Sequence, residues 1–276
     1  MNFPEEKTII GVIDADSHLD ANYLRQVVYD FNHSNCDLLQ TRVNIYNLEH
    51  NIAAMQNFEF TIYNSLLQMA RTDWGSSLAS GNGQFMTLKM TNNVGWSSSL
   101  LEDCQFSLKG LLKGYRGTFL NTVSIGQEGV TKYKKLIKQR TCWCQGGFQC
   151  LGKYSKKIVK SKSIPSMVKT FVLLFLLIPV FSMITTPASA ISFIVLLLYM
   201  KTNALINFSI ITILLIIEYF TNTLLILNQW REAKLDEPLK ILFLIDFYRW
   251  SLAIVPYKAL GRILVGNQSW SKTSHT

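Results

Sequence analysis

The chain has 276 residues, of which 49% are hydrophobic, and it carries a formal net charge of +9 at pH 7. This length and apolar content leave room for one soluble domain together with a membrane portion. Five cysteines make an odd count with no CxxC pair, which suits a reducing compartment. A zinc site is disfavoured because no histidine lies at finger-like spacing from them.

The apolar residues divide the sequence at Pro165. Before it the chain reads as a mixed, turn-rich globular domain, and after it come long apolar runs. The N-terminus has no charged segment followed by an apolar stretch, so no signal peptide is expected to carry residues 1 to about 160 across a membrane. We therefore expect this first domain to be cytoplasmic.

A short β-branched apolar run over residues 8–13 predicts a strand buried in a parallel sheet, and it ends at Asp14, Ala15 and Asp16. The two acids are therefore expected at the carboxyl end of a strand, the edge where open α/β sheets bind ligands. Acids in D-x-D spacing can hold a divalent cation against a diphosphate. A strand-to-helix turn with Asp16 as the helix cap is the more frequent explanation of such a pair.

Four further elements are expected in the first hundred residues. Helical spacing covers residues 23–31, a strand covers 37–43, and a longer helix covers 51–71. Residues 80–85 form a glycine turn with an apolar exit, whose ordinary role is a hairpin or loop. Its functional alternative is to let the backbone approach a sugar closely, because glycine has no side chain in the way.

Two adjacent carboxylates, Glu102 and Asp103, lie between an apolar pair and the expected start of a helix that carries Phe106 and Leu108. This position places Asp103 at a junction rather than on a solvated face, where a carboxylate can act as a base. The alternative is ordinary helix chemistry, since acids are favoured in any first helical turn.

The segment from Gly129 to Lys162 contains ten Lys or Arg residues and no acid. Apolar residues are interspersed with these cations in its first part, which predicts an amphipathic helix lying on a membrane surface. Nucleic acid would also attract this charge. A basic stretch that directly precedes apolar spans is better explained by the anionic cytoplasmic leaflet, so we expect membrane lipid rather than nucleic acid as the partner.

Four apolar segments follow, at residues 167–184, 187–200, 204–227 and 239–255. The first and third are long enough to span a bilayer, the second is short, and the fourth is marginal. The positive-inside tendency places the tail in the cytoplasm because it carries three cations, Lys258, Arg262 and Lys272. Two or four crossings of the plasma membrane are therefore favoured.

Three charged residues within these segments need partners. Asp246 and Arg249 lie three residues apart on one helical face, where the pair can neutralise itself. Glu218 should face protein or a polar cavity rather than lipid.

Five short motifs occur in an order and spacing that resemble one family. They are Asp14-Ala15-Asp16, Gly81-Asn82-Gly83-Gln84-Phe85, Leu101-Glu102-Asp103, Gln139-Arg140-Thr141-Cys142-Trp143 and Trp270-Ser271-Lys272-Thr273. With the apolar spans, they resemble the membrane-embedded family-2 glycosyltransferases related to cellulose, chitin, hyaluronan and poly-N-acetylglucosamine synthases. The resemblance covers most of the chain and implies an α/β fold with a GT-A, or Rossmann-like, nucleotide-sugar domain.

The resemblance implies a role for each matching residue. Asp14 and Asp16 match the D-x-D acids that hold Mg²⁺ or Mn²⁺ on a nucleotide-sugar diphosphate, with Asp16 the direct ligand. Asp103 matches the general base on the acceptor hydroxyl, and Glu102 its orienting neighbour. The acceptor sugar is approached by the glycine turn and by the Q-x-x-R-W signature, here Gly83, Gln84, Gln139 and Trp143. An interfacial anchor is the alternative role of the tryptophan.

Two features depart from the family pattern. The arginine of the signature, which contacts the diphosphate in the family, is Cys142 here, and Arg140 and Lys138 are the candidate substitutes. Thirteen residues precede Asp14, whereas the family has a substantial stretch there that holds the nucleotide base. We therefore expect a partial catalytic domain, completed by a separate N-terminal half or another synthase subunit.

The expected organisation has four parts. They are a partial GT-A domain (1–128), a basic amphipathic interface segment (129–164), a transmembrane region (165–260) and a cytoplasmic tail (261–276). The expected function is transfer of a sugar, from a UDP-linked donor to a growing polysaccharide, with inversion because one base acts without a covalent intermediate. The rival from another class is a non-catalytic membrane subunit or degenerate copy that binds a synthase or a polysaccharide.

Overall fold

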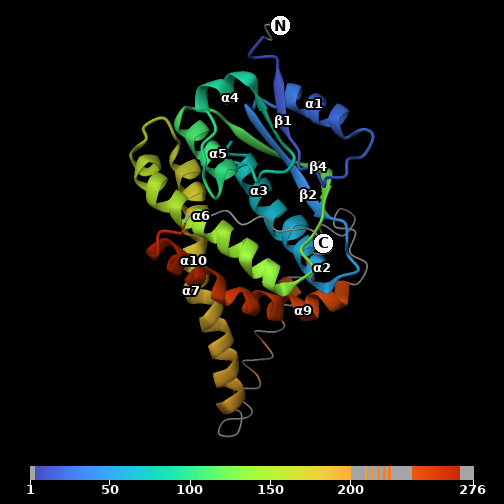
Figure 1. Cartoon of the computed structure of the whole chain (residues 1–276), viewed down its shortest axis with the longest axis vertical. Coiled ribbons are helices and arrows are strands. Elements are labelled where there is room, and N and C mark those ends of the chain that lie inside the picture. Colours follow the sequence, from blue (N-terminus) through green and yellow to red (C-terminus); the bar gives the residue numbers. More distant parts are fainter. Residues whose placement is uncertain are drawn as a thin grey trace.

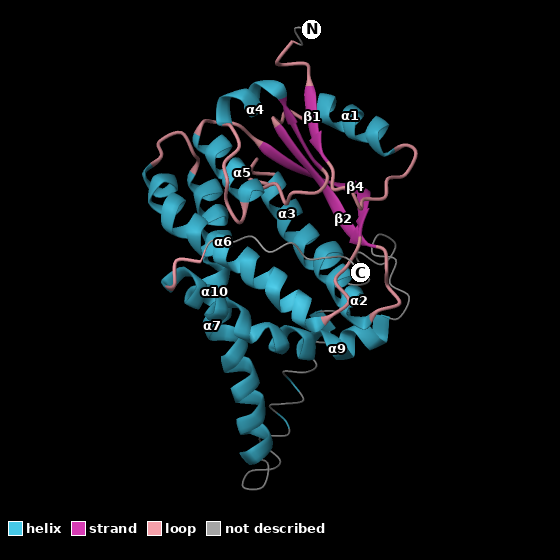
Figure 2. Ribbon diagram, viewed as in Figure 1, coloured by secondary structure: helices cyan, strands magenta, loops and turns pink. Residues whose placement is uncertain are grey.

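The structure, a computed structural model, describes residues 4–199, seven single positions between 209 and 224, and residues 238–267. Its centre is a four-stranded sheet (Figure 1, Figure 2). The strands lie in the order β1-β3-β2-β4, with bounds β1 Ile9–Val12, β2 Leu38–Ile45, β3 Gln84–Thr87 and β4 Gly117–Gln127.

The sheet is mixed rather than parallel. β3 runs antiparallel to both β1 and β2, whereas β2 and β4 are parallel. The prediction of a strand buried in a parallel sheet is wrong for β1, which is a four-residue edge strand with half-buried or exposed side chains. Its apolar residues still pack against helices on the two faces of the sheet, Ile9 on one and Ile10 and Val12 on the other. A β-branched run therefore does not distinguish an edge from a centre.

Helices cover both faces of the sheet (Figure 1), namely α1 (Tyr23–His33) on one face and α4 (Leu88–Val94) and α5 (Glu102–Leu112) on the other. α1 packs through three side chains that recur every fourth position, Tyr23, Val27 and Phe31. Met90 and Phe106 pack from the opposite side against Leu38 and Met86. The expected helix over 23–31 and strand over 37–43 are confirmed.

The expected long helix over 51–71 is present as a continuous run in three parts. These are α2 (Asn51–Phe58), a π-helical stretch η1 (Glu59–Asn64) and α3 (Ser65–Thr72). π-Helical turns within helices recur at functional sites. Here the first residue of the stretch, Glu59, makes an ion pair described below.

The C-terminal part is helical, with α6 (Tyr133–Lys160), α7 (Ser166–Tyr199), α9 (Pro238–Ser251), the short η2 (Leu252–Ile254) and α10 (Val255–Leu264). The expected helix in the basic segment is confirmed as α6, while its position on a membrane surface stays a prediction. Its apolar face is buried in a cluster that joins Cys104 of α5, Cys150 and Ile158 of α6, and Val168 and Val172 of α7. The part of α7 nearest the domain is therefore packed against protein, and the rest extends away from the domain (Figure 1).

Among the described residues, one helix segment is long and apolar enough to cross a membrane, Ser166–Ala188 in α7, with a mean hydropathy of 2.3 in its best window. The expected segments 167–184 and 187–200 are not separate, because α7 runs through both with Pro179 and Pro187 inside it. The two prolines therefore mark no helix boundary here.

The remaining expectations for the apolar region divide into two groups. The Asp246–Arg249 pair is present on α9, with 3.8 Å between Oδ1 and Nη1. The segment 204–227 as a continuous span, Glu218 and the motif at 270–273 lie outside the described residues.

Candidate active site

Asp14 and Asp16 follow β1 at the sheet edge where three strands end. β1, β2 and β4 run in one direction, so their carboxyl ends and the start of β3 meet at this edge. The expected position of the acids at a strand's carboxyl end is confirmed. Such edges of α/β sheets are where ligands bind.

The glycine turn before β3 lies at the same edge and is tightly held. Gly81 and Gly83 have φ angles of 88° and 73°, which residues with side chains rarely adopt. A Cβ on Gly83 would collide with the Thr41 hydroxyl and lie 3.0 Å from the Tyr23 hydroxyl. These two hydroxyls are 2.6 Å apart, and Thr41 Oγ1 donates a hydrogen bond to the Gly83 carbonyl at 3.1 Å. The backbone of the turn is thus packed directly onto α1 and β2.

Asp103 lies in the first turn of α5, beside the glycine turn. A Cβ placed on Gly81 would be 3.6 Å from Asp103 Oδ2. Burial raises the pKa of Asp103 to about 7, and the charges of Glu102 and Asp14 add to the rise against a 2.6 Å hydrogen bond from the Cys104 N–H to Oδ1. Because Asp14 influences this pKa, the first D-x-D acid and Asp103 share one electrostatic environment.

The charge of Asp16 acts on the residue that follows β2. The pKa of the Tyr46 hydroxyl, which follows β2, is raised by burial and then by the charges of Glu128 and Asp16. Within the described ranges, no group of three or more His, Cys, Asp or Glu is arranged to hold a metal ion. Two carboxylates still fit Mg²⁺ or Mn²⁺, because such ions commonly take their remaining ligands from substrate phosphates and water.

Arg140 is engaged by the protein itself. Its Nη2 lies 2.7 Å from Glu59 Oε2, and the Tyr248 hydroxyl of α9 donates to the same oxygen at 3.1 Å. The guanidinium also lies over the rings of Trp143, at 4.6 Å, and Phe60, at 5.3 Å. In the structure Arg140 therefore joins α6 to η1 and α9, and a contact with a diphosphate stays a prediction.

The other signature residues lie along α6. Cys142 is buried, and Gln139 has a buried Oε1 for which the described chain provides no hydrogen-bond partner. Further along α6, a Cβ on Gly146 would lie 2.6 Å from Leu101 Cβ. The helix that carries the signature is thereby pressed against the residues just before Asp103, while the ring contacts described for Trp143 are with Arg140 and Phe60.

Gln84, the first residue of β3, is fully buried. It shares a strand face with Met86, which packs on the α5 side of the sheet. Neither atom of its side-chain amide has a hydrogen-bond partner within the described chain. Leaving such a group unsatisfied costs about 1–3 kcal/mol, which a polar ligand or a water molecule would offset.

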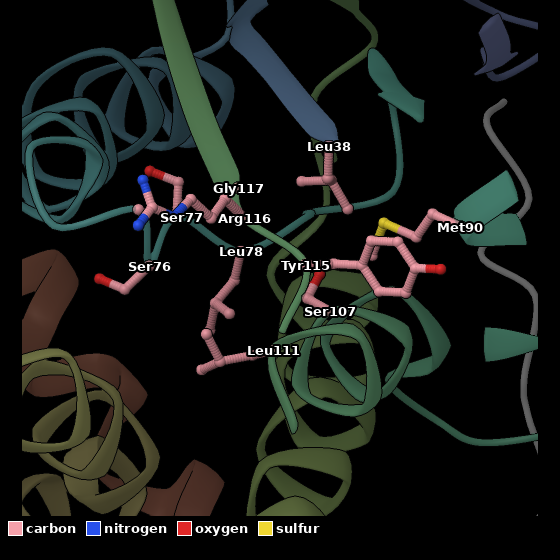
Figure 3. Close-up of a pocket in the computed structure, with 11 residues that line it drawn as sticks. Leu38, Ser76, Ser77, Leu78, Met90, Ser107, Leu111, Tyr115, Arg116 and Gly117 are labelled. Carbon is pink, nitrogen blue, oxygen red and sulfur yellow. The ribbon is translucent and has the colours of Figure 1, made fainter. Parts of the chain in front are cut away.

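A small pocket lies at the opposite edge of the sheet (Figure 3). Its lining includes Leu38 and Gly117, the first residues of β2 and β4, together with Ser107 of α5. These are the amino ends of β2 and β4, whose carboxyl ends lie at the edge where Asp14 and Asp16 follow β1. The pocket is therefore separate from the candidate active site.

Sequence analysis alone does not identify the residues that hold the glycine turn. Tyr23 and Thr41 lie on otherwise apolar faces of α1 and β2, and a hydroxyl in such a position is the signal that could mark them. The sequence marks Asn82 only as part of a motif. It does not show the hydrogen bonds of Asn82, because these join residues that are distant in the chain.

The mixed α/β sheet, with acids at its carboxyl edge, has the architecture of a GT-A glycosyltransferase. The model of the glycosyl transferase family group 2 matches residues 9–227. The chain belongs to this family.

Curated relatives support the assignment. A beta-monoglucosyldiacylglycerol synthase of Synechocystis sp. is 30% identical over 144 residues, which are 51% of this chain and 30% of that protein. A protein of the same name from Trichormus variabilis is 27% identical over 157 residues, 56% of this chain and 34% of that protein. The chain thus spans about a third of the length of the curated relatives it matches.

A solved structure shares the fold. It is a mannosyltransferase from Pyrobaculum calidifontis in complex with GDP-Man and Mn²⁺, and it superposes with a TM-score of 0.54 at 13% identity. The match covers 93% of this chain and 62% of that chain. At this identity the likeness shows the fold alone.

These comparisons confirm membership of glycosyltransferase family 2 and the enzyme class. The comparisons do not test the finer expectations. The kinship with polysaccharide synthases, the partial catalytic domain, the multi-pass plasma-membrane location and the roles of single residues stay predictions.

Proposed function

We propose that the chain transfers a sugar from a nucleotide-sugar donor, UDP-linked, to an acceptor hydroxyl at the membrane, with inversion of the anomeric carbon. One observation carries the proposal: Asp103, whose pKa is raised to about 7, lies beside the glycine turn and within electrostatic reach of Asp14. A base with a pKa near the working pH is the most effective proton acceptor.

In the proposed reaction Asp103 accepts the proton of the acceptor hydroxyl as its oxygen attacks the anomeric carbon. The bond from that carbon to the nucleoside diphosphate breaks at the same time, so the configuration inverts without a covalent intermediate. Glu102 keeps the Asp103 carboxyl basic by its charge, because a neighbouring anion disfavours ionisation.

Asp14 and Asp16 are the residues that would hold a divalent cation against the diphosphate. When bound, Mg²⁺ or Mn²⁺ supplies charge neutralisation for the leaving group. The donor set favours this role, since two carboxylates at a strand end leave coordination positions for phosphate oxygens.

For the acceptor we propose a growing polysaccharide or glycan approached by Gly83, Gln84, Gln139 and Trp143. The side-chain amide of Gln84 and the Oε1 atom of Gln139 are buried without a hydrogen-bond partner in the described chain, which supports recognition of a polar acceptor by these two residues. The names of the curated relatives favour a second candidate, a lipid hydroxyl such as that of diacylglycerol.

We further propose that the donor side is completed by a separate N-terminal half or another synthase subunit. The outer edge of β1 supports this proposal, because the described sheet pairs β1 on the β3 side alone. An edge strand offers free backbone groups on which a further strand can be added.

The test is Asp103→Asn in the full chain, assayed with radiolabelled UDP-sugars, a glycan acceptor and diacylglycerol, with and without a co-expressed N-terminal partner. Loss of a general base lowers turnover by about 10²–10⁴-fold. The matched control is Asp73→Asn, an exposed acid outside the site. Wild-type turnover in Asp103→Asn would remove this residue from the mechanism, and donor binding without transfer by the wild-type chain would favour the non-catalytic subunit.

A further inference from the structure

We propose that Asn82, in the middle of the glycine turn, is the positioning residue that fixes the D-x-D loop relative to Asp103. The inference rests on the proposed function, because it assigns a role to Asn82 within the same site. Asn82 touches neither reacting atom in the proposed reaction, so it acts through the residues that it holds.

The side-chain oxygen of Asn82 binds the D-x-D loop. Oδ1 accepts a hydrogen bond from the Asp14 N–H at 3.1 Å and a second from Ser17 Oγ at 3.0 Å. These donors lie 68 and 65 positions away in the chain. The loop of Asp14 and Asp16 is therefore fastened at both ends to a single amide group.

The rest of Asn82 is anchored to β2 and β4. Its Nδ2 donates to Gln127 Oε1 at the end of β4, at 3.2 Å. Its backbone carbonyl accepts from Gln40 Nε2 of β2 at 2.8 Å, and Gln40 Oε1 accepts from the Ser80 N–H at 2.8 Å. Asn82 is buried, with 3% exposure of the residue, so these bonds are little weakened by competing water.

This network sets the spacing between the two halves of the site. Asn82 is bonded to Asp14 on one side, and its neighbour Gly81 packs against Asp103 on the other. An asparagine in a turn commonly bonds its own nearby backbone. Here the four bonds of Asn82 reach other segments of the chain, so Asn82 holds the backbone that carries the Asp14 and Asp16 carboxylates.

The experiment compares Asn82→Ala and Asn82→Asp in the full chain in detergent. The probes are Mn²⁺ alone and Mn²⁺ with UDP. In Asn82→Ala we expect affinity for Mn²⁺ with UDP to fall about 10- to 100-fold, the range typical of residues that orient metal ligands. The KM for the donor should rise while the pH midpoint of turnover, set by Asp103, stays in place.

Asn82→Asp should restore most of the affinity. Its carboxylate still accepts from the Asp14 N–H and Ser17 Oγ, and the Gln127 amide can rotate to donate to it. The matched control is Asn92→Ala, an exposed asparagine bonded to Glu5 and away from the site, which should behave as the wild type.

Amide hydrogen exchange over residues 13–18 tests the network independently of activity. The Asp14 N–H loses its acceptor in Asn82→Ala, so its exchange should become faster than in the wild type and in Asn92→Ala. Unchanged exchange, or faster exchange with unaltered affinity and KM, would overturn the inference. A wild-type chain that binds neither probe and transfers no sugar would refute the proposed function instead, and the exchange measurement would still decide whether Asn82 holds the loop.

Discussion

At the scale of single residues, the activity should depend on pH through the pKa of Asp103. Below about pH 7 this carboxyl is protonated and cannot accept a proton, so turnover should rise with pH and level off above that value. The Glu102 charge raises this pKa. Glu102→Gln should therefore move the rising limb of kcat/KM to lower pH.

The measurement is a pH–rate profile of the wild type, Glu102→Gln and the exposed-acid control Glu49→Gln. Near pH 6 the Glu102→Gln variant should be faster than the wild type, and above pH 8 the two should converge. A uniform loss at every pH would mean that Glu102 acts by orienting Asp103 and not by its charge.

The same residue should limit the stability of the fold. The folded protein holds the Asp103 proton up to about pH 7, whereas the unfolded chain releases it near the ordinary value of 3.8. The free energy of unfolding is therefore lowered progressively as pH rises between these values. Asp103→Asn avoids the ionised buried carboxylate, so its Tm should exceed the wild-type value at pH 8 by about 2–6 °C and match it near pH 4. Thermal unfolding in detergent at both pH values checks this, and a lower Tm at pH 8 contradicts it.

At the scale of elements, local patterns predict those helices and strands that bury one face. α1, β2 and the run α2–η1–α3 begin and end within two residues of their expected bounds, because apolar periodicity reports a half-buried surface. The edge position of β1 is not local, since it depends on β3 entering between β1 and β2. The same limit applies to the site. The sequence predicts that the acids lie at a strand end, but it does not predict the partners of Asn82 and Arg140, which come from distant segments.

Arg140 shows how such a distant partner stabilises an element. It pairs with Glu59, 81 positions away, and its side chain is 11% exposed against 33% for Glu59. Glu59→Gln would leave a buried guanidinium without its counter-charge, which should lower the free energy of unfolding by about 2–4 kcal/mol. Thermal unfolding is the readout, with Glu6→Gln, one partner of the exposed Lys89 bridge, as the control expected to change nothing measurable. Equal Tm values for the two variants would show that the Tyr248 contact, rather than the ion pair, joins α6 to η1 and α9.

At the scale of the whole molecule, we propose that α7 connects the glycosyltransferase-fold domain to the membrane. Val172 and Leu176 are buried in the cluster shared with α5 and α6, whereas Ile178, Phe181 and Ile184 are exposed. One face of the first turns of α7 is therefore buried in protein, whereas apolar side chains of its later turns are exposed. An exposed apolar helix of this length is the pattern of a membrane span.

Ile178→Arg tests this assignment, because the position lies near the middle of Ser166–Ala188 and is 44% exposed. An arginine at the centre of a span disfavours insertion by about 2.5–3.5 kcal/mol. The fraction of chain that resists alkaline carbonate extraction from membranes should therefore fall sharply. Val159→Arg, at an exposed position of α6 outside the span, should not reduce it. If Ile178→Arg stays in the carbonate-resistant fraction, α7 is not the span; if the wild type itself is released by high salt, the cations of α6 hold the chain at the membrane by charge alone.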